Sequence, residues 1–217
     1  LDLEASELLK RATLQGVDEA AKYLRSGKVN IGGWSLPAQL AANDRAFQTD
    51  LERLAGLAPT AQEMGFKTCN VDVDPGSEDM PFHENFERHR ERLSKIGDIL
   101  EPLDIRLGLR LQPTAAQREG CKFPFVHRAE ELLTLIRTTD HKSVGLALDT
   151  WSWKVGGGAN DQLSVLQGHQ IVTVCLADLP EDADLATVNT TDRLLLTVDT
   201  VDQHAQLLAM LVECEYE

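Results

Sequence analysis

Short runs rich in β-branched and aliphatic residues alternate along the chain with longer segments of helical periodicity. Five runs predict strands, at 29–34, 68–73, 105–111, 144–149 and 171–178. Between them, apolar residues recur at steps of three and four, as in Phe47, Leu51, Leu54, Ala58 and Ala61, and in Phe82, Phe86, Leu93, Ile96 and Leu100. Each of these segments predicts a helix with one apolar face. The alternation therefore predicts parallel βα units in an α/β fold.

Two parallel architectures compete, a closed (β/α)₈ TIM barrel and an open doubly wound sheet. A dinucleotide-type doubly wound sheet needs a glycine-rich turn directly after a strand, whereas the glycines at 156–158 follow their strand by several residues and lack that spacing. Polar residues gather instead at the C-terminal ends of the predicted strands: Trp34 and Ser35, Asp72 and Asp74, Arg110 and Gln112, Asp149, and Asp178. In a barrel these ends meet at one mouth, so we favour a single TIM-barrel domain over 1–217.

Composition and charge limit the partners. The chain has 217 residues, 42% of them hydrophobic, which is enough for a substantial core. Its formal net charge of −14 is unfavourable for nucleic-acid binding, and the basic run at 88–95, interrupted by Glu91, is interpreted as a solvated helix face. No apolar stretch approaches the roughly 20 residues of a membrane span. The four cysteines show no paired spacing, which predicts a reducing, cytoplasmic setting without disulfides or zinc knuckles.

Three strand ends carry a resemblance to a known family. In order, DIRLGLRLQPT (104–114), VGLALDTWSW (144–153) and IVTVCLADLP (171–180) resemble strand ends of the xylose isomerase-like TIM barrels, the sugar phosphate isomerase/epimerase superfamily. The resemblance extends through 63–73, 86–109 and 207–217. It implies that residues 1–217 lack about one and a half strands at the front and one at the back of a TIM barrel. Either the sequence is a fragment of a longer chain, which we favour, or the barrel is open on one side. Residues 1–4 would then be the tail of the family's second strand.

The resemblance also implies a chemistry. In the family a proton moves between neighbouring carbons of a sugar, which requires carboxylates on both faces of the substrate and a divalent cation such as Mn, Mg or Zn. Carried over by position, one glutamate ligand falls on Arg110, the aspartate on Asp149, the histidine three residues later on Ser152, and another histidine on Cys175. The last glutamate would lie beyond Glu217, and among the other positions Asp149 alone matches. A degenerate metal site is therefore expected, and no cofactor unless a metal binds at Asp149.

Several of these positions admit a second interpretation. A slip of two residues would put Gln112 in place of Arg110 without supplying a carboxylate. Cys175 could ligate zinc as a thiolate, but it is interpreted as a small packed residue. Trp34, Trp151 and Trp153 could form an aromatic floor for a sugar ring or pack in the core. The six histidines are interpreted as surface or helix-face residues (His83, His89, His127, His141, His169 and His204).

Three functional hypotheses follow. The first is a metal-dependent isomerase or epimerase with unusual ligands. The second is a metal-free relative that binds a sugar or polyol, or assists a protein partner, without catalysis. The third, an abasic-site endonuclease-like protein, needs a cluster of zinc ligands and a basic groove that the sequence does not offer. A homo-oligomer is left open, and the candidate substrate-binding residues are Trp34, Arg110, Gln112, Asp149, Trp151, Ser152, Cys175 and Asp178.

A buried Asp149 needs a positive partner once metal ligands are lost. Because Arg110 lies on the preceding strand of the sheet, we expect an ion pair between Arg110 and Asp149 at the family's metal position. Ser152 and Cys175 are expected to line this pair.

Overall fold

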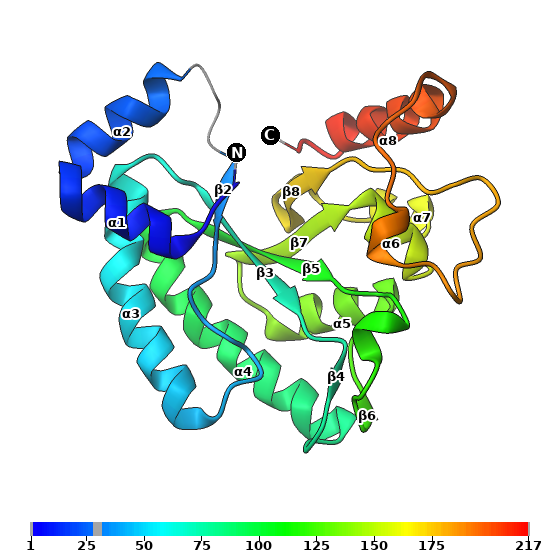
Figure 1. The fold of residues 1–217 in the computed structure, drawn as a ribbon, viewed down its shortest axis with the longest axis horizontal. Helices are drawn as coiled ribbons and strands as arrows, with labels where there is room; N and C mark the ends of the chain where they lie inside the picture. The colour runs from blue at the N-terminus through cyan, green and yellow to red at the C-terminus, as the bar shows by residue number, and fades with distance from the viewer. Residues whose placement is uncertain (1, 28–31, 217) are drawn as a thin grey trace.

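The computed structural model describes residues 2–27 and 32–216 of the chain (Figure 1). Six strands form one parallel sheet in the order β1-β2-β3-β5-β7-β8. Their bounds are β1 (Asp2–Leu3), β2 (Gly33–Ser35), β3 (Thr68–Val73), β5 (Arg106–Leu111), β7 (Val144–Asp149) and β8 (Ile171–Cys175). Each neighbour in the sheet is also the next of these strands along the chain, as in a TIM barrel.

The predicted strand order is confirmed. All five predicted runs contain strands of this sheet, although the run at 29–34 overlaps residues 28–31, which lie outside the described residues. Residues Asp2–Leu3 pair in parallel with β2, as expected for the tail of an earlier strand. A short antiparallel pair, β4 (Gly76–Ser77) with β6 (Phe123–Pro124), was not predicted from the pattern. These two strands have two residues each, too few for an alternation to show.

The sheet is strongly curled. Thr173 on β8 donates a hydrogen bond at 3.2 Å to the side-chain oxygen of Asn70 on β3, although β5 and β7 lie between these strands. Gly108 on β5 permits this closeness, because a Cβ there would stand 2.5 Å from the Asn70 oxygen and 2.9 Å from the Ala147 Cβ. Asn70, Gly108 and Thr173 therefore lie inside the barrel. Side chains from distant strands meet in the interior, which is the packing that defines this fold.

Helices cover the outside of the sheet (Figure 1). They are α1 (Ala5–Gln15), α2 (Val17–Ser26), α3 (Asp44–Glu63), α4 (Phe82–Leu100), α5 (Ala129–Thr139), α6 (Thr150–Val155), α7 (Asn160–Ser164) and α8 (Val201–Glu213), with short 3₁₀ turns at 101–103, 116–118, 168–170, 190–192 and 198–200. The two periodic segments predicted as helices lie within α3 and α4. None of the described helices is long and apolar enough to cross a membrane.

The basic run at 88–95 differs from its prediction as a solvated helix face. It lies on α4, where His89 is fully buried and Arg92 is 3% exposed. The guanidinium of Arg92 donates to the carbonyls of Leu40 and Ala42 at 2.6 Å each, and to Asp44 at 2.7 Å. The prediction of a solvated face was therefore wrong for these two residues. A buried arginine is acceptable here because its donors are paired.

Candidate functional site

Asp149 lies where β7 ends and α6 begins. Every residue of β7 is buried, and Asp149 itself is 5% exposed. Its backbone is extended, and its Oδ1 accepts a hydrogen bond from the Ser152 N–H at 2.9 Å, so that Asp149 caps the N-terminus of α6. The sequence thus places a carboxylate at the mouth and fixes its orientation with the next helix. The Ser152 backbone, rather than its hydroxyl, makes this contact.

The positive partner of Asp149 is Arg193, not Arg110. The Nη2 of Arg193 donates to Asp149 Oδ2 and also lies 3.3 Å from the Cys175 sulfur. Partial burial works to lower the pKa of Arg193, but the hydrogen bond and charge of Asp149 outweigh it and raise that pKa. Both Asp149 oxygens are therefore occupied by donors from the protein. The expectation of an Arg110–Asp149 pair was wrong.

Strand register explains this correction. Arg110 stands directly opposite Asp72 on β3, and its Nη1 lies 3.5 Å from the Asp72 carboxylate. The β5–β7 register pairs Leu109 with Leu146, and its continuation would put Arg110 opposite Ala147, two residues short of Asp149. Two residues of strand correspond to about 6.6 Å. Asp72 is the nearer carboxylate, so Arg110 pairs with it instead.

Cys175 is in direct register with Asp149 on the neighbouring strand. The cysteine is exposed, so its interpretation as a packed core residue was wrong. Desolvation of the sulfur and the charge of Asp149 raise the pKa of Cys175, against the opposing effect of Arg193 and Arg110. The thiol is therefore neutral near pH 7, and a metal would have to displace its proton to bind there.

A cavity of about 720 Å³ opens beside Arg110, at the C-terminal ends of the strands, the end of the sheet that also carries Asp149. Its walls include Trp34, Ser35, residues 36 and 38–42 after β2, and Asn70, Asp72, Asp74 and Arg110. Asn70 is 7% exposed and its amide nitrogen has no partner among the described residues. Burial, and then the charge of Asp72, raise the pKa of Asp74. The cavity thus offers both hydrogen-bond donors and acceptors, as a ligand rich in hydroxyl groups requires.

The segment 36–43 that forms one wall of this cavity is tied to the helices behind it. Arg92 on α4 binds its carbonyls, as described above, and the Arg53 guanidinium on α3 donates to the Pro37 carbonyl at 2.5 Å. Asp50, also on α3, accepts from the Gln39 N–H at 3.1 Å. The wall is therefore held from two helices.

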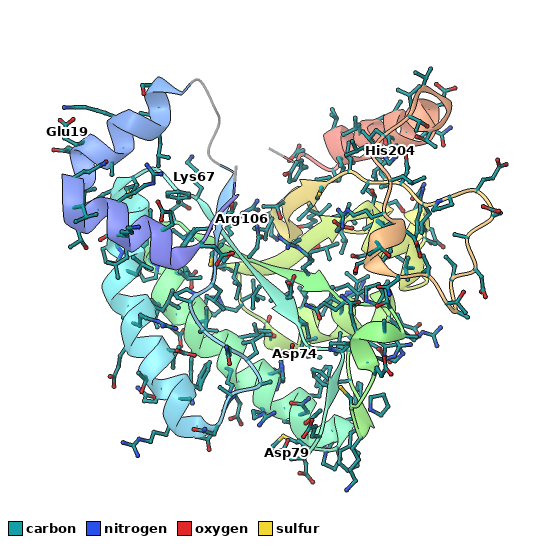
Figure 2. The ribbon with its side chains drawn as sticks, in the orientation of Figure 1. Glu19, Lys67, Asp74, Asp79, Arg106 and His204 are labelled. Atoms are coloured by element: carbon teal, nitrogen blue, oxygen red, sulfur yellow. The ribbon has the colours of Figure 1, made fainter. Side chains whose placement is uncertain are left out.

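A larger hollow of about 1260 Å³ lies at the opposite end of the sheet, lined by residues such as Lys67, Asp104, Arg106 and His169. Figure 2 shows Lys67 and Arg106 near the N-terminal ends of β3 and β5, far from Asp74 at the C-terminal end of β3. TIM barrels carry their active sites at the C-terminal ends of the strands. We therefore take the smaller cavity and the Asp149 cluster, which lie at the same end of the sheet, as the candidate site.

The other expected site residues occupy less direct positions. Trp34, Trp151 and Trp153 are all buried, so their rings pack in the core, although Trp34 also borders the cavity. Gln112 lies just beyond the end of β5. Asp178, just after β8, is buried, and the Nε2 of His204 on α8 lies 2.6 Å from its Oδ1; Figure 2 labels His204. His89 on α4 and His204 on α8 are helix residues, as interpreted, but both are buried and so are not surface residues.

Three residues of the site were not found from the sequence: Asn70, Arg193 and His204. Asn70 carries a detectable signal, because a polar residue at the centre of an apolar strand points to a barrel interior. Arg193 lies on the long connection after β8, which has no periodicity, and so nothing in the sequence indicates its contact with Asp149.

The residues at the family's metal positions that lie within the described part of the chain offer few ligands to a divalent cation. Asp149 is the single carboxylate among Arg110, Asp149, Ser152 and Cys175, and both its oxygens accept hydrogen bonds from protein donors. The described residues contain no group of three or more His, Cys, Asp or Glu side chains arranged to hold a metal. Zinc and manganese sites in proteins need at least three such ligands.

Comparison with known proteins gives a consistent result. The family model described as xylose isomerase-like TIM barrel matches residues 3–207. A xylose isomerase domain protein from Alicyclobacillus acidocaldarius has a TM-score of 0.84 at 20% identity, covering 97% of this chain and 75% of that one. The IOLI protein with a zinc atom has a TM-score of 0.77 at 17% identity, covering 97% of this chain and 74% of that one. The 3-keto-D-glucoside 4-epimerase from E. coli has a TM-score of 0.70 at 12% identity, covering 100% of this chain and 78% of that one. A search of curated proteins gave no match.

Proposed function

The chain belongs to the xylose isomerase-like TIM barrel family, and from this premise we propose that it binds a sugar or polyol at the barrel mouth, with Arg193 rather than a divalent cation as the positive group on Asp149. The contact of Arg193 with Asp149 and Cys175 carries the proposal. A guanidinium has donors in a fixed fork, and one nitrogen makes both of these contacts. The remaining nitrogens can donate to ligand oxygens.

The adjoining cavity supports this assignment. A volume of about 720 Å³ lies within the range of small-molecule sites, roughly 300–1,000 Å³. Its walls supply donors from Arg110 and Asn70 and acceptors from Asp72 and Asp74. Neutral polyhydroxyl ligands need both kinds of group, because each hydroxyl donates one hydrogen bond and accepts others. The epimerases among the structural neighbours, which include the 3-keto-D-glucoside 4-epimerase, suggest the same ligand class.

Calorimetry with a panel of ketoses, polyols and glycosides tests the proposal. We expect binding that is unchanged by EDTA, and no stoichiometric Mn²⁺ or Zn²⁺ after incubation with the metal and dialysis. The Arg193→Met variant should bind the same sugar about tenfold or more weakly, because hydrogen bonds from charged donors contribute about 1.5–3 kcal/mol. Arg128→Met is the matched control, since Arg128 is an exposed arginine that pairs with Glu130 and does not line the cavity.

A metal-dependent isomerase or epimerase is the rival hypothesis. One Mn²⁺ or Zn²⁺ per chain, lost in Asp149→Asn and accompanied by turnover of a ketose, would establish it and overturn our proposal. Sugar binding that is equal in Arg193→Met and wild type would also overturn it.

A further inference from the structure

Asp178 is a buried carboxylate just after β8, and both of its oxygens have protein donors. The residue is 2% exposed. His204 Nε2 on α8 lies 2.6 Å from Oδ1, and the Thr200 hydroxyl donates to Oδ2. Burial works to raise the pKa of Asp178, but these two hydrogen bonds, together with the charges of His204 and Lys154, lower it below its ordinary value. Asp178 is thus ionised at neutral pH, with its cost of burial offset by two donors.

The backbone of Asp178 makes a second connection. Its N–H and carbonyl pair with the carbonyl and N–H of Leu194, at 2.9 Å each, in an antiparallel bridge. This bridge joins the two ends of the connection 179–193. Arg193 is the last residue of that connection, directly before Leu194. The position of Arg193 is therefore set at the bridge, one residue away.

The opposite side of the contact is fixed as well. Thr150, next to Asp149, accepts from the Ala177 N–H at 2.8 Å and donates to the Ala177 carbonyl at 2.7 Å. The segment 177–178 is thus fastened to α6 by Thr150 and to α8 by His204. Asp149 directly precedes Thr150, which holds one side of this segment. Arg193 directly precedes Leu194, which is bridged to the other side.

We propose that Asp178, held by Thr200 and His204, is a positioning residue that keeps the Arg193 guanidinium on Asp149. The three residues form a clamp at the base of the connection 179–193. Without the clamp, the bridge to Leu194 loosens and Arg193 leaves Asp149 for solvent. The inference rests on the proposed function only in giving Arg193 a role toward ligand; the clamp itself concerns geometry in the free protein.

The side-chain ¹⁵N signals of Arg193 test the clamp without any ligand. A guanidinium held on a carboxylate exchanges its protons more slowly than a solvated one, and the Arg193 signal is assigned by its absence in Arg193→Met. Asp149→Asn gives the reference position for the released side chain. We expect Thr200→Val, which removes the hydroxyl but keeps the shape, to move the signal most of the way to that reference. Thr200→Ser restores the hydroxyl and should keep the wild-type signal.

His204 provides a second pair of variants. His204→Leu should release Arg193, whereas His204→Gln, which retains an N–H donor, should retain the contact at least in part. The amide spectrum identifies variants that fail to fold, and Thr200→Val is the mildest change. A wild-type Arg193 signal in folded Thr200→Val and His204→Leu overturns the inference, because Asp178 would then only anchor α8.

Sugar titration separates this outcome from that of the proposed function. If Arg193 is released in Thr200→Val but no sugar of the panel binds the wild type, the clamp stands and the proposed function fails. If sugars bind wild type and Thr200→Val equally while the Arg193 signal does not move, the clamp fails and the proposed function stands.

Discussion

At the mouth of the barrel Asp149 has two separable roles, one for each oxygen. Oδ1 caps α6 through the Ser152 N–H, and Oδ2 receives Arg193. Asparagine is as good an N-cap as aspartate but carries no charge. Asp149→Asn therefore removes the ion pair and keeps the cap, whereas Asp149→Ala removes both. We expect Asp149→Ala to have a free energy of unfolding about 1 kcal/mol lower than Asp149→Asn, measured by urea denaturation.

The charge of Asp149 makes the stability of the fold depend on its partner, Arg193. Arg193→Met leaves a buried carboxylate without a cation and should lower the free energy of unfolding by about 1–3 kcal/mol, less than for a fully buried pair because Arg193 keeps 35% of its side chain exposed. In the double variant with Asp149→Asn, Arg193→Met should lower the free energy of unfolding by less than it does in the wild-type background. Additive losses in this double-mutant cycle would mean that the two side chains do not interact in solution.

Sequence reasoning found the carboxylate of this site but not the cation. Asp149 is recognisable because it ends an apolar strand, so local pattern alone places it at the mouth. The choice between Arg110 and Arg193 depends on strand register and on the path of a long connection. Register is a tertiary property, and a difference of two residues leaves the side-chain alternation along β5 unchanged. The sequence pattern therefore carries no information that could separate the two.

Among the elements, the segment 36–43 between β2 and α3 depends on α4 for its shape. Arg92 provides donors for two carbonyls of this segment from a fully packed position. Arg92→Met should lower the free energy of unfolding by about 2–4 kcal/mol, because each buried polar group left without a partner costs about 1–3 kcal/mol. Sugar binding in the adjoining cavity should weaken in parallel. Urea denaturation and calorimetry measure the two effects.

Arg90 on the same helix supplies the control for that variant. It forms an exposed pair with Glu87, three residues earlier. Arg90→Met should change the free energy of unfolding by less than about 0.5 kcal/mol, since exposed pairs contribute little. Equal effects of the two substitutions would show that Arg92 does not hold the segment.

Helices and strands were predictable to the extent that a repeating pattern marks them. The helices α3 and α4 and the longer strands, such as β3, have apolar repeats over six or more residues. The alternation of strands and helices along the chain marks the βα order. The basic run on α4 misled because charge was taken as exposure, whereas Arg92 is buried and its hydrogen bonds go to carbonyl and carboxylate oxygens. Those oxygens belong to residues about fifty positions away, beyond any local pattern.

For the whole molecule, two buried titratable groups, His89 and Asp178, determine how the free energy of unfolding changes at acid pH. The net charge of −14 falls as pH is lowered toward the sequence pI of about 4.8, which relieves repulsion and favours the folded state. His89 acts in the opposite direction. It is fully buried beside Phe125, its Nδ1 lies 2.8 Å from the Asn85 carbonyl, and burial lowers its pKa to about 4.

The sign for His89 follows from linkage. The unfolded chain binds the proton with a pKa of about 6.5, and the folded chain binds it only near 4, so protonation favours unfolding. The contribution of neutral, buried His89 to the free energy of unfolding is fully present above about pH 6.5. It is lost as the pH decreases to about 4, by about 3 kcal/mol in total. Denaturation at a series of pH values should show this slope in wild type and its absence in His89→Leu. The exposed His83 on the same helix is the control, and His83→Gln should retain the slope.

Below this window the clamp at Asp178 determines the next loss. The pKa of Asp178 in the folded protein lies below its ordinary value of about 3.9, so its ionised form favours folding. This contribution is complete above about pH 5 and disappears as pH falls through the lower folded-state pKa. The charged groups that face the carboxylate are His204 on α8 and Lys154 on α6, and Thr200 adds a neutral donor. The difference in free energy of unfolding between wild type and Asp178→Asn should thus shrink as the pH falls below about 4. A difference of the same size at pH 2 would show that Asp178 stabilises the fold through its shape and not through its charge.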